Sequence, residues 1–153
     1  MFSTYANSND SYYLDLHFDG NSHLVLGGWN TAWRKTAATF TDTTGWYHIV
    51  CVLDTAESAA SDRIRVYVDG VELTEFTTSG DPVQFGVMPF NQTAIHRIGA
   101  NAYYTDNAAD FDGSMAEVHF IDGEALNPAD FGYELAGWWL PKACLLYTSD
   151  AAD

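Results

Sequence analysis

Residues 63–73 read RIRVYVDGVEL, and this stretch decides the fold. Ile64, Val66 and Val68 alternate with charged or aromatic residues, which is the period-two pattern of a strand with one buried face. Asp69-Gly70 follows directly, and an Asp-Gly pair tolerates the positive φ angles of a tight turn. The chain then returns as a second short apolar run. The stretch therefore predicts a β-hairpin.

The same alternation extends along most of the chain. It predicts strands at residues 12–18 and 23–26 on either side of Asp19-Gly20, a weaker strand at 33–40, and further strands at 94–99 and 116–120. Residues 46–53 are apolar on both faces, which favours a central strand. Residues 127–132 are the one helical turn, capped by Asn127 with proline at its first position. The side chains expected to face inward are Ile49, Cys51, Val66, Val68, Val118 and Phe120. About seven or eight short strands indicate a sandwich or jelly roll.

Composition excludes several classes of protein. The 153 residues are 47% hydrophobic and 15% aromatic, which is enough for a packed core. Six Lys and Arg oppose 21 Asp and Glu, and a net charge of -15 excludes nucleic acid as a partner. The sequence has no apolar run of spanning length, so we expect no membrane insertion, and its first residues show no signal-peptide pattern.

The last ten residues, 144–153, read CLLYTSDAAD. This string matches a translation of TGT CTC TTA TAC ACA TCT GAC GCT GCC GAC, which resembles a transposase adapter used in sequencing libraries. We therefore predict a partial jelly-roll domain at 1–143 and a translated adapter, outside the fold, at 144–153. Without Asp150 and Asp153, 19 acidic residues remain against six basic ones, a net charge of -13. Cys51 then stands alone in an apolar strand, so no disulfide framework is implied.

Three motifs in order resemble a known family. They are GWYHIV at residues 45–50, RIRVYVDG at 63–70, and the F-x-G-x-hydrophobic-x-E-V string at 111–118. Together they are similar to the laminin-G-like, pentraxin-like branch of concanavalin A-like jelly rolls, and most similar to modules in virion and tail-associated proteins of marine bacteriophages. Residues 121–132 and 138–142 resemble closing segments of that module. The resemblance covers residues 2–142 and implies an all-β fold, a two-sheet antiparallel β-sandwich. Relatives carry further strands, so it also implies truncation at both ends.

The resemblance makes enzymatic activity a possibility to test, because related folds include glycoside hydrolases. Their Glu-x-Asp-x-x-Glu string is absent from this sequence. Glu117, His119 and Asp122 lie close together in sequence, but a solvated surface is the favoured interpretation. Within its apolar strand, His48 is interpreted as structural. We therefore predict a protein that is not an enzyme.

An acidic loop suggests a metal site. Asn101, Asp106, Asp110 and Asp112 supply hard oxygen ligands within a dozen residues, and calcium takes six to eight such oxygens. Members of the resembled branch hold calcium at the sandwich rim. The spacing fits no fixed calcium signature, so a solvated loop stays as the alternative.

Aromatic residues suggest a sugar-binding surface. Tyr103 and Tyr104 in the same loop, and Trp29 and Trp33, offer flat rings for stacking, with burial in the core as the alternative for the tryptophans. The resemblance favours a non-catalytic module of a phage virion or tail protein that binds a cell-surface glycan or receptor, located in the virion or outside the cell. The alternatives are a structural decoration domain that contacts other virion protein segments, or a glycoside hydrolase-related domain.

Overall fold

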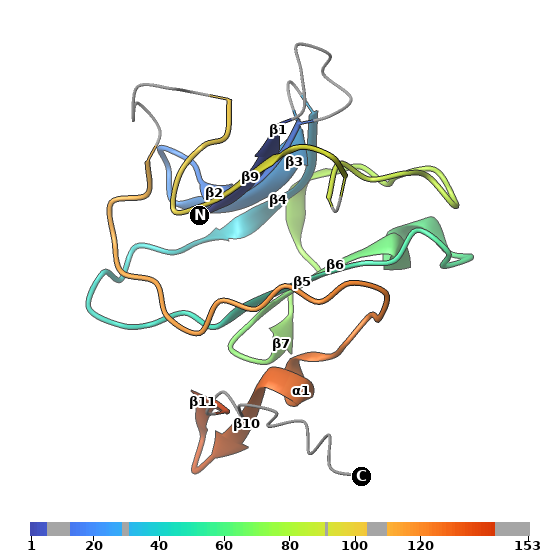
Figure 1. Ribbon diagram of the computed structural model, residues 1–153. Helices are drawn as coiled ribbons and strands as arrows, with labels where there is room; N and C mark the ends of the chain where they lie inside the picture. The colour runs from blue at the N-terminus through green and yellow to red at the C-terminus, as the bar shows by residue number, and fades with distance from the viewer. Residues whose placement is uncertain (6–12, 29–30, 91, 104–109, 143–153) are drawn as a thin grey trace, which may run out of the picture.

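The computed structural model describes residues 1–5, 13–28, 31–90, 92–103 and 110–142 (Figure 1). Two antiparallel sheets form the body of the described chain, and one short helix and one separate hairpin follow them. This arrangement confirms the predicted all-β sandwich.

The larger sheet of the described chain has six strands, and neighbouring strands in it run antiparallel. We call it the large sheet. Its order is β8 (Phe76–Ser79), β4 (Thr31–Thr39), β3 (His23–Gly28), β2 (Tyr13–Phe18), β1 (Phe2–Tyr5) and β9 (Ile95–Ile98). The small sheet has the order β5 (Ile49–Leu53), β6 (Ile64–Val68) and β7 (Val71–Glu72). A single turn of 3-10 helix, η2 (Ala60–Arg63), leads into β6.

Two aspartates form the hairpin turns that the sequence predicts. Asp69 and Gly70 both have positive φ, 51° and 79°, as a two-residue turn between β6 and β7 requires. Asp19 closes the turn between β2 and β3, because its Oδ1 accepts the backbone N–H groups of Asn21 and His23 at 2.9 Å each. Lys35 on β4 reaches the other oxygen of Asp19 at 2.7 Å and ties a third strand to this turn.

The core lies between the two sheets. Leu14, Leu24 and Leu26 of the large sheet are at most 2% exposed. Facing them from the small sheet are Ile64, Val66 and Val68. Ile49 and Cys51 also pack against this cluster, which confirms the inward face predicted for β5 and β6.

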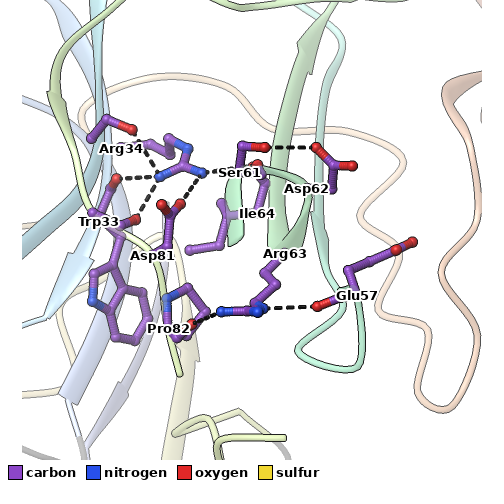
Figure 2. A network of polar contacts seen from close by, with 11 residues as sticks. Trp33, Arg34, Glu57, Ser61, Asp62, Arg63, Ile64, Asp81 and Pro82 are labelled. Atoms are coloured by element: carbon purple, nitrogen blue, oxygen red, sulfur yellow. Dashed lines mark hydrogen bonds and ion pairs between the residues drawn. The ribbon is translucent and has the colours of Figure 1, made fainter. Parts of the chain in front are cut away.

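One buried arginine joins the two sheets at their edge. Arg34 on β4 is 3% exposed, and its guanidinium donates to the carbonyls of Ser61 and Ile64 at 3.2 Å (Figure 2). It also donates to Asp81 Oδ1 at 2.7 Å and to the carbonyl of Gly80 at 2.5 Å. A single side chain thus crosslinks β4, η2, the start of β6 and the turn after β8.

Two predictions about strands were wrong. Residues 116–120 do not form a ladder, and Val118 and Phe120 are 49% and 54% exposed. Glu117 has φ 51°, and this left-handed residue interrupts the alternation that placed both side chains inward. Residues 46–53 are not a central strand: β5 begins at Ile49, Trp46 is 68% exposed, and β6 occupies the middle of the small sheet.

The last described elements form a small unit beside β7 (Figure 1). Asn127 caps helix α1 (Pro128–Phe131) as the sequence predicts, and its backbone N–H donates to Asp130 Oδ2 at 2.8 Å. Strands β10 (Gly132–Leu135) and β11 (Trp138–Pro141) then pair as a hairpin. In the part of the chain that the structure describes, we find no helix with the length and apolar character needed to cross a membrane.

Candidate functional site

The candidate site lies on the face of the large sheet that points away from the core. Leu14 of β2 is fully buried in the core, and successive side chains of a strand point to opposite faces. Tyr13, Asp15 and His17 therefore share the outer face of β2. Asp15 lies opposite Ser3 of β1 in the register.

Residues 99–103 fold over this outer face. Ser3 fastens them, because its hydroxyl donates to the carbonyl of Ala100 at 2.8 Å and accepts the N–H of Ala102 at 2.6 Å. Ala102 is 3% exposed as a result. The loop that follows β9 is thereby held against β1 and β2.

Asn101 connects the loop to β2. Its side-chain Nδ2 donates to the hydroxyl of Tyr13 and lies 3.5 Å from Asp15 Oδ2. Its Oδ1 accepts the backbone N–H of Tyr103 at 2.9 Å, and Arg97 donates to its backbone carbonyl at 3.3 Å. Both ends of the Asn101 carboxamide are therefore used in fixing the loop.

Asp15 is the buried carboxylate of this site. Its Oδ2 accepts the Tyr13 hydroxyl at 2.6 Å and lies 3.2 Å from His17 Nδ1. The Asp15 side chain is 12% exposed and that of His17 is 41% exposed.

Tyr103 supplies the aromatic surface of the site. Its ring contacts Tyr5 edge-on, with centroids 5.2 Å apart, and Tyr13 at 6.4 Å. Tyr103 nevertheless stays 40% exposed. We call Tyr13, Asp15, His17, Asn101 and Tyr103 the outer-face cluster.

Asp19, Cys51 and His48, which lie away from the cluster, have shifted pKa values, and each shift has a structural cause. The hydrogen bond from Lys35, with help from the backbone N–H groups of the turn, lowers the pKa of Asp19 to about 2. Burial raises the pKa of Cys51 to about 12, so this thiol is a core residue and a poor nucleophile. Burial also lowers the pKa of His48.

The structure separates the predicted sugar-binding residues. Tyr103 belongs to the outer-face cluster, whereas Trp33 packs against the core cluster and beside Gly80. Tyr104 and Trp29 lie outside the described residues.

The predicted calcium ligands are also divided. Asp110 and Asp112 are exposed, and the carboxamide oxygen of Asn101 already accepts the N–H of Tyr103. Across the described ranges, no three His, Cys, Asp or Glu side chains form a group that could hold a metal ion. Asp106 lies outside those ranges, so calcium at this loop stays a prediction.

Sequence reasoning missed Tyr13, Asp15 and His17. The signal was present, because these residues form the polar side of the alternation in residues 12–18. The pattern predicted a strand with one buried face and assigned no role to its polar side. The local pattern does not show the loop of residues 99–103, which lies more than 80 positions away in the sequence and covers Asp15.

Comparison with known proteins agrees with the fold. A family model described as the concanavalin A-like lectin/glucanases superfamily matches residues 1–130. Comparisons with curated proteins and with solved structures gave no match. The matched range includes both sheets and the whole outer-face cluster, and it covers most of the 153 residues. The chain belongs to the concanavalin A-like lectin/glucanases superfamily.

Proposed function

We propose that this domain is a non-catalytic, lectin-like module that binds a cell-surface glycan at the outer-face cluster. The observation that carries the proposal is Tyr103, an aromatic ring that is 40% exposed and contacts Tyr13, whose hydroxyl donates to the Asp15 carboxylate. Flat apolar surface next to fixed polar groups is the combination that a sugar ring needs. A sugar has apolar C–H faces and hydroxyls at its edge.

The cluster is held in place before any ligand arrives. Asn101 fixes the backbone of Tyr103 through one hydrogen bond and reaches the Tyr13 hydroxyl through another. Groups that are already ordered lose less conformational entropy on binding, which favours affinity. In this proposal Tyr103 and His17 contact the sugar, and Asp15 positions Tyr13 by accepting its hydroxyl.

The same cluster supports binding more than hydrolysis. A retaining glycosidase needs two carboxyl groups about 5–5.5 Å apart, one as nucleophile and one as acid. The outer-face cluster contains one carboxylate, that of Asp15. Glu117 and His119 face each other at 3.9 Å, but they lie on the irregular segment between β9 and α1.

The setting we propose is a phage virion or tail protein, in which this module contributes to adhesion. The support is the resemblance of residues 45–50, 63–70 and 111–118 to such modules. Mass spectrometry of purified particles, searching for peptides of residues 13–103, tests the setting separately from the ligand.

A glycan array with the full chain tests the binding function. Wild type, Tyr103→Ala and Asp15→Asn are applied at equal concentration, and each hit is titrated by calorimetry. We expect Tyr103→Ala to weaken binding by about 1–3 kcal/mol through lost stacking, by analogy with aromatic stacking on planar rings. Asp15→Asn should weaken it less, because the amide retains the shape but not the charge.

The matched control is Tyr133→Ala on β10. The exposed fraction of Tyr133, 45%, is similar to that of Tyr103, but Tyr133 lies on the separate hairpin. It should leave affinity unchanged. Absence of any hit, or equal losses for Tyr103→Ala and Tyr133→Ala, would refute the site and favour a structural decoration domain.

A further inference from the structure

The side chain of Trp139 joins the hairpin of β10 and β11 to the small sheet, and we call this contact the Trp139 seat. Its ring lies against Gly70 in the turn between β6 and β7 and against Gly132 at the start of β10. At both glycines the indole occupies the space that a Cβ would need. The neighbouring Trp138 is 75% exposed. Of these two neighbouring tryptophans, Trp139 is the one that lies against the turn between β6 and β7.

A hydrogen bond with a defined direction also holds the Trp139 ring in this position. Trp139 Nε1 lies 2.9 Å from Nδ1 of His48, the residue just before β5. The indole N–H can only donate, so His48 Nδ1 must be unprotonated and accept. The neutral ring then carries its proton on Nε2.

We propose that the pair His48–Trp139 is a pH-sensitive latch, in which protonation of His48 Nδ1 releases the β10–β11 hairpin from the small sheet. An imidazolium carries hydrogens on both ring nitrogens and has no acceptor. Two N–H groups would then face each other across the present hydrogen bond. The indole would lose its partner while still partly buried, which disfavours the closed arrangement.

The charged groups around His48 act in both directions. Asp69, in the turn that Trp139 covers, accepts the backbone N–H of His48 at 2.8 Å and favours a positive ring. His119, on the segment before α1, disfavours it, and His119 itself lies 3.9 Å from Glu117. Burial is the largest effect, and the net result is a lowered pKa for His48.

The sign of the pH effect follows from this lowering. A released His48 regains its ordinary pKa of about 6.5, so the released form binds a proton more readily than the closed form. The closed hairpin is therefore favoured above about pH 6.5. It is progressively lost as the pH falls from that value towards the lower pKa of the closed state.

Three large side chains of the hairpin are exposed and contribute little to holding it in place. Tyr133, Leu135 and Trp138, on the face away from the seat, are 45%, 56% and 75% exposed. A two-stranded hairpin is marginally stable by itself in water, so its order depends on the seat. Loss of one contact at Trp139 should therefore be measurable over the whole hairpin.

Hydrogen exchange with mass spectrometry on the full chain tests the latch. Protection of residues 132–141 is followed from about pH 8 to about pH 5, corrected for the intrinsic pH dependence of exchange. We expect protection to fall with pH, at most about tenfold per unit, while the β2 and β3 peptides stay constant.

Three variants make the test specific. His48→Asn keeps an acceptor near the Nδ1 position that does not titrate, so protection should become independent of pH. Trp139→Phe removes the donor but keeps an aromatic ring, and should give low protection at every pH. His119→Gln removes the group that disfavours a charged His48, so the transition should move to higher pH.

Two results would overturn the latch. The first is wild-type protection of residues 132–141 that does not change across this range. The second is an unchanged pH dependence in His48→Asn.

Discussion

Replacing Arg34 by methionine should destabilise the domain more than removing any other buried charge of the described chain. Methionine has a similar length and no donors, so Arg34→Met removes the whole guanidinium network at once. The carboxylate of Asp81 and the carbonyls of Ser61 and Ile64 lose their partner (Figure 2). The two sheets lose their polar crosslink at this edge.

The magnitude follows from burial. Breaking a buried ion pair by removing one partner costs about 3–5 kcal/mol, because the remaining charge is left uncompensated. The Asp81 side chain is 31% exposed, so water recovers part of that loss, whereas the Arg34 side chain is 3% exposed. We therefore expect about 3 kcal/mol, a large share of the 5–15 kcal/mol that stabilises a typical domain.

Urea unfolding followed by fluorescence measures this loss as a change in the free energy of unfolding. Arg65→Met on β6 is the matched control. Arg65 donates a long hydrogen bond to the Tyr67 hydroxyl at 3.5 Å, and its buried Nε has no partner among the described residues. The control should cost less than about 1 kcal/mol. A loss below about 1 kcal/mol for Arg34→Met, or equal losses for the two variants, would refute the crosslink.

Four further predictions follow from the same structure and sequence. Phe120→Ala should cost about 1–2 kcal/mol in urea unfolding because Phe120 is 54% exposed, whereas Leu26→Ala, at 1% exposure, should cost about 2–5 kcal/mol; equal costs would mean that Phe120 is buried. Because the fold lowers the pKa of Asp19 to about 2, the ionised carboxylate stabilises the domain above about pH 4, and this stability is lost as the pH falls through about 2. Asp19→Asn should therefore reduce the dependence of the urea midpoint on pH in the acid range, and an unchanged dependence would contradict this. Calcium at a hundred times its dissociation constant should stabilise the wild type by about 2.7 kcal/mol in a thermal shift and Asp112→Ala by less; no shift at millimolar calcium would rule out the loop site. Deleting residues 144–153 should leave the thermal midpoint unchanged, since an adapter was never selected to pack, and a clear loss would disprove that origin.

Local patterns were enough to predict most of the sandwich. The turns at Asp19-Gly20 and Asp69-Gly70 and the cap at Asn127 follow from a few neighbouring residues, and each is present. The inward face of β6 follows from strict alternation. These features depend on chemistry within a few positions, which a single sequence displays.

Features set by distant contacts were missed or wrong. Strands β1 and β8 are four residues each, too short to show a period, and form through pairing with β2, β9 and β4. The alternation around Phe120 predicted a buried strand, but the left-handed backbone at Glu117 changes which side each residue faces.

The outer-face cluster depends on one such distant contact. Residues 99–103 fold over β2 and help to bury Asp15, and Ser3 and Asn101 hold them there. Nothing near Asp15 in the sequence indicates that cover. The loop residues Asn101 and Tyr103 could be nominated from composition, but their partners on β2 could not.

The most direct test of the binding proposal maps a glycan onto the protein. Backbone amide resonances of the full chain are recorded with increasing amounts of the strongest hit from the array. The proposal predicts concentration-dependent shifts confined to residues 13–17 and 99–103, with the amides of β6 and of the β10–β11 hairpin unchanged. Shifts centred on the hairpin or on β5, with residues 13–17 and 99–103 unaffected, would contradict it.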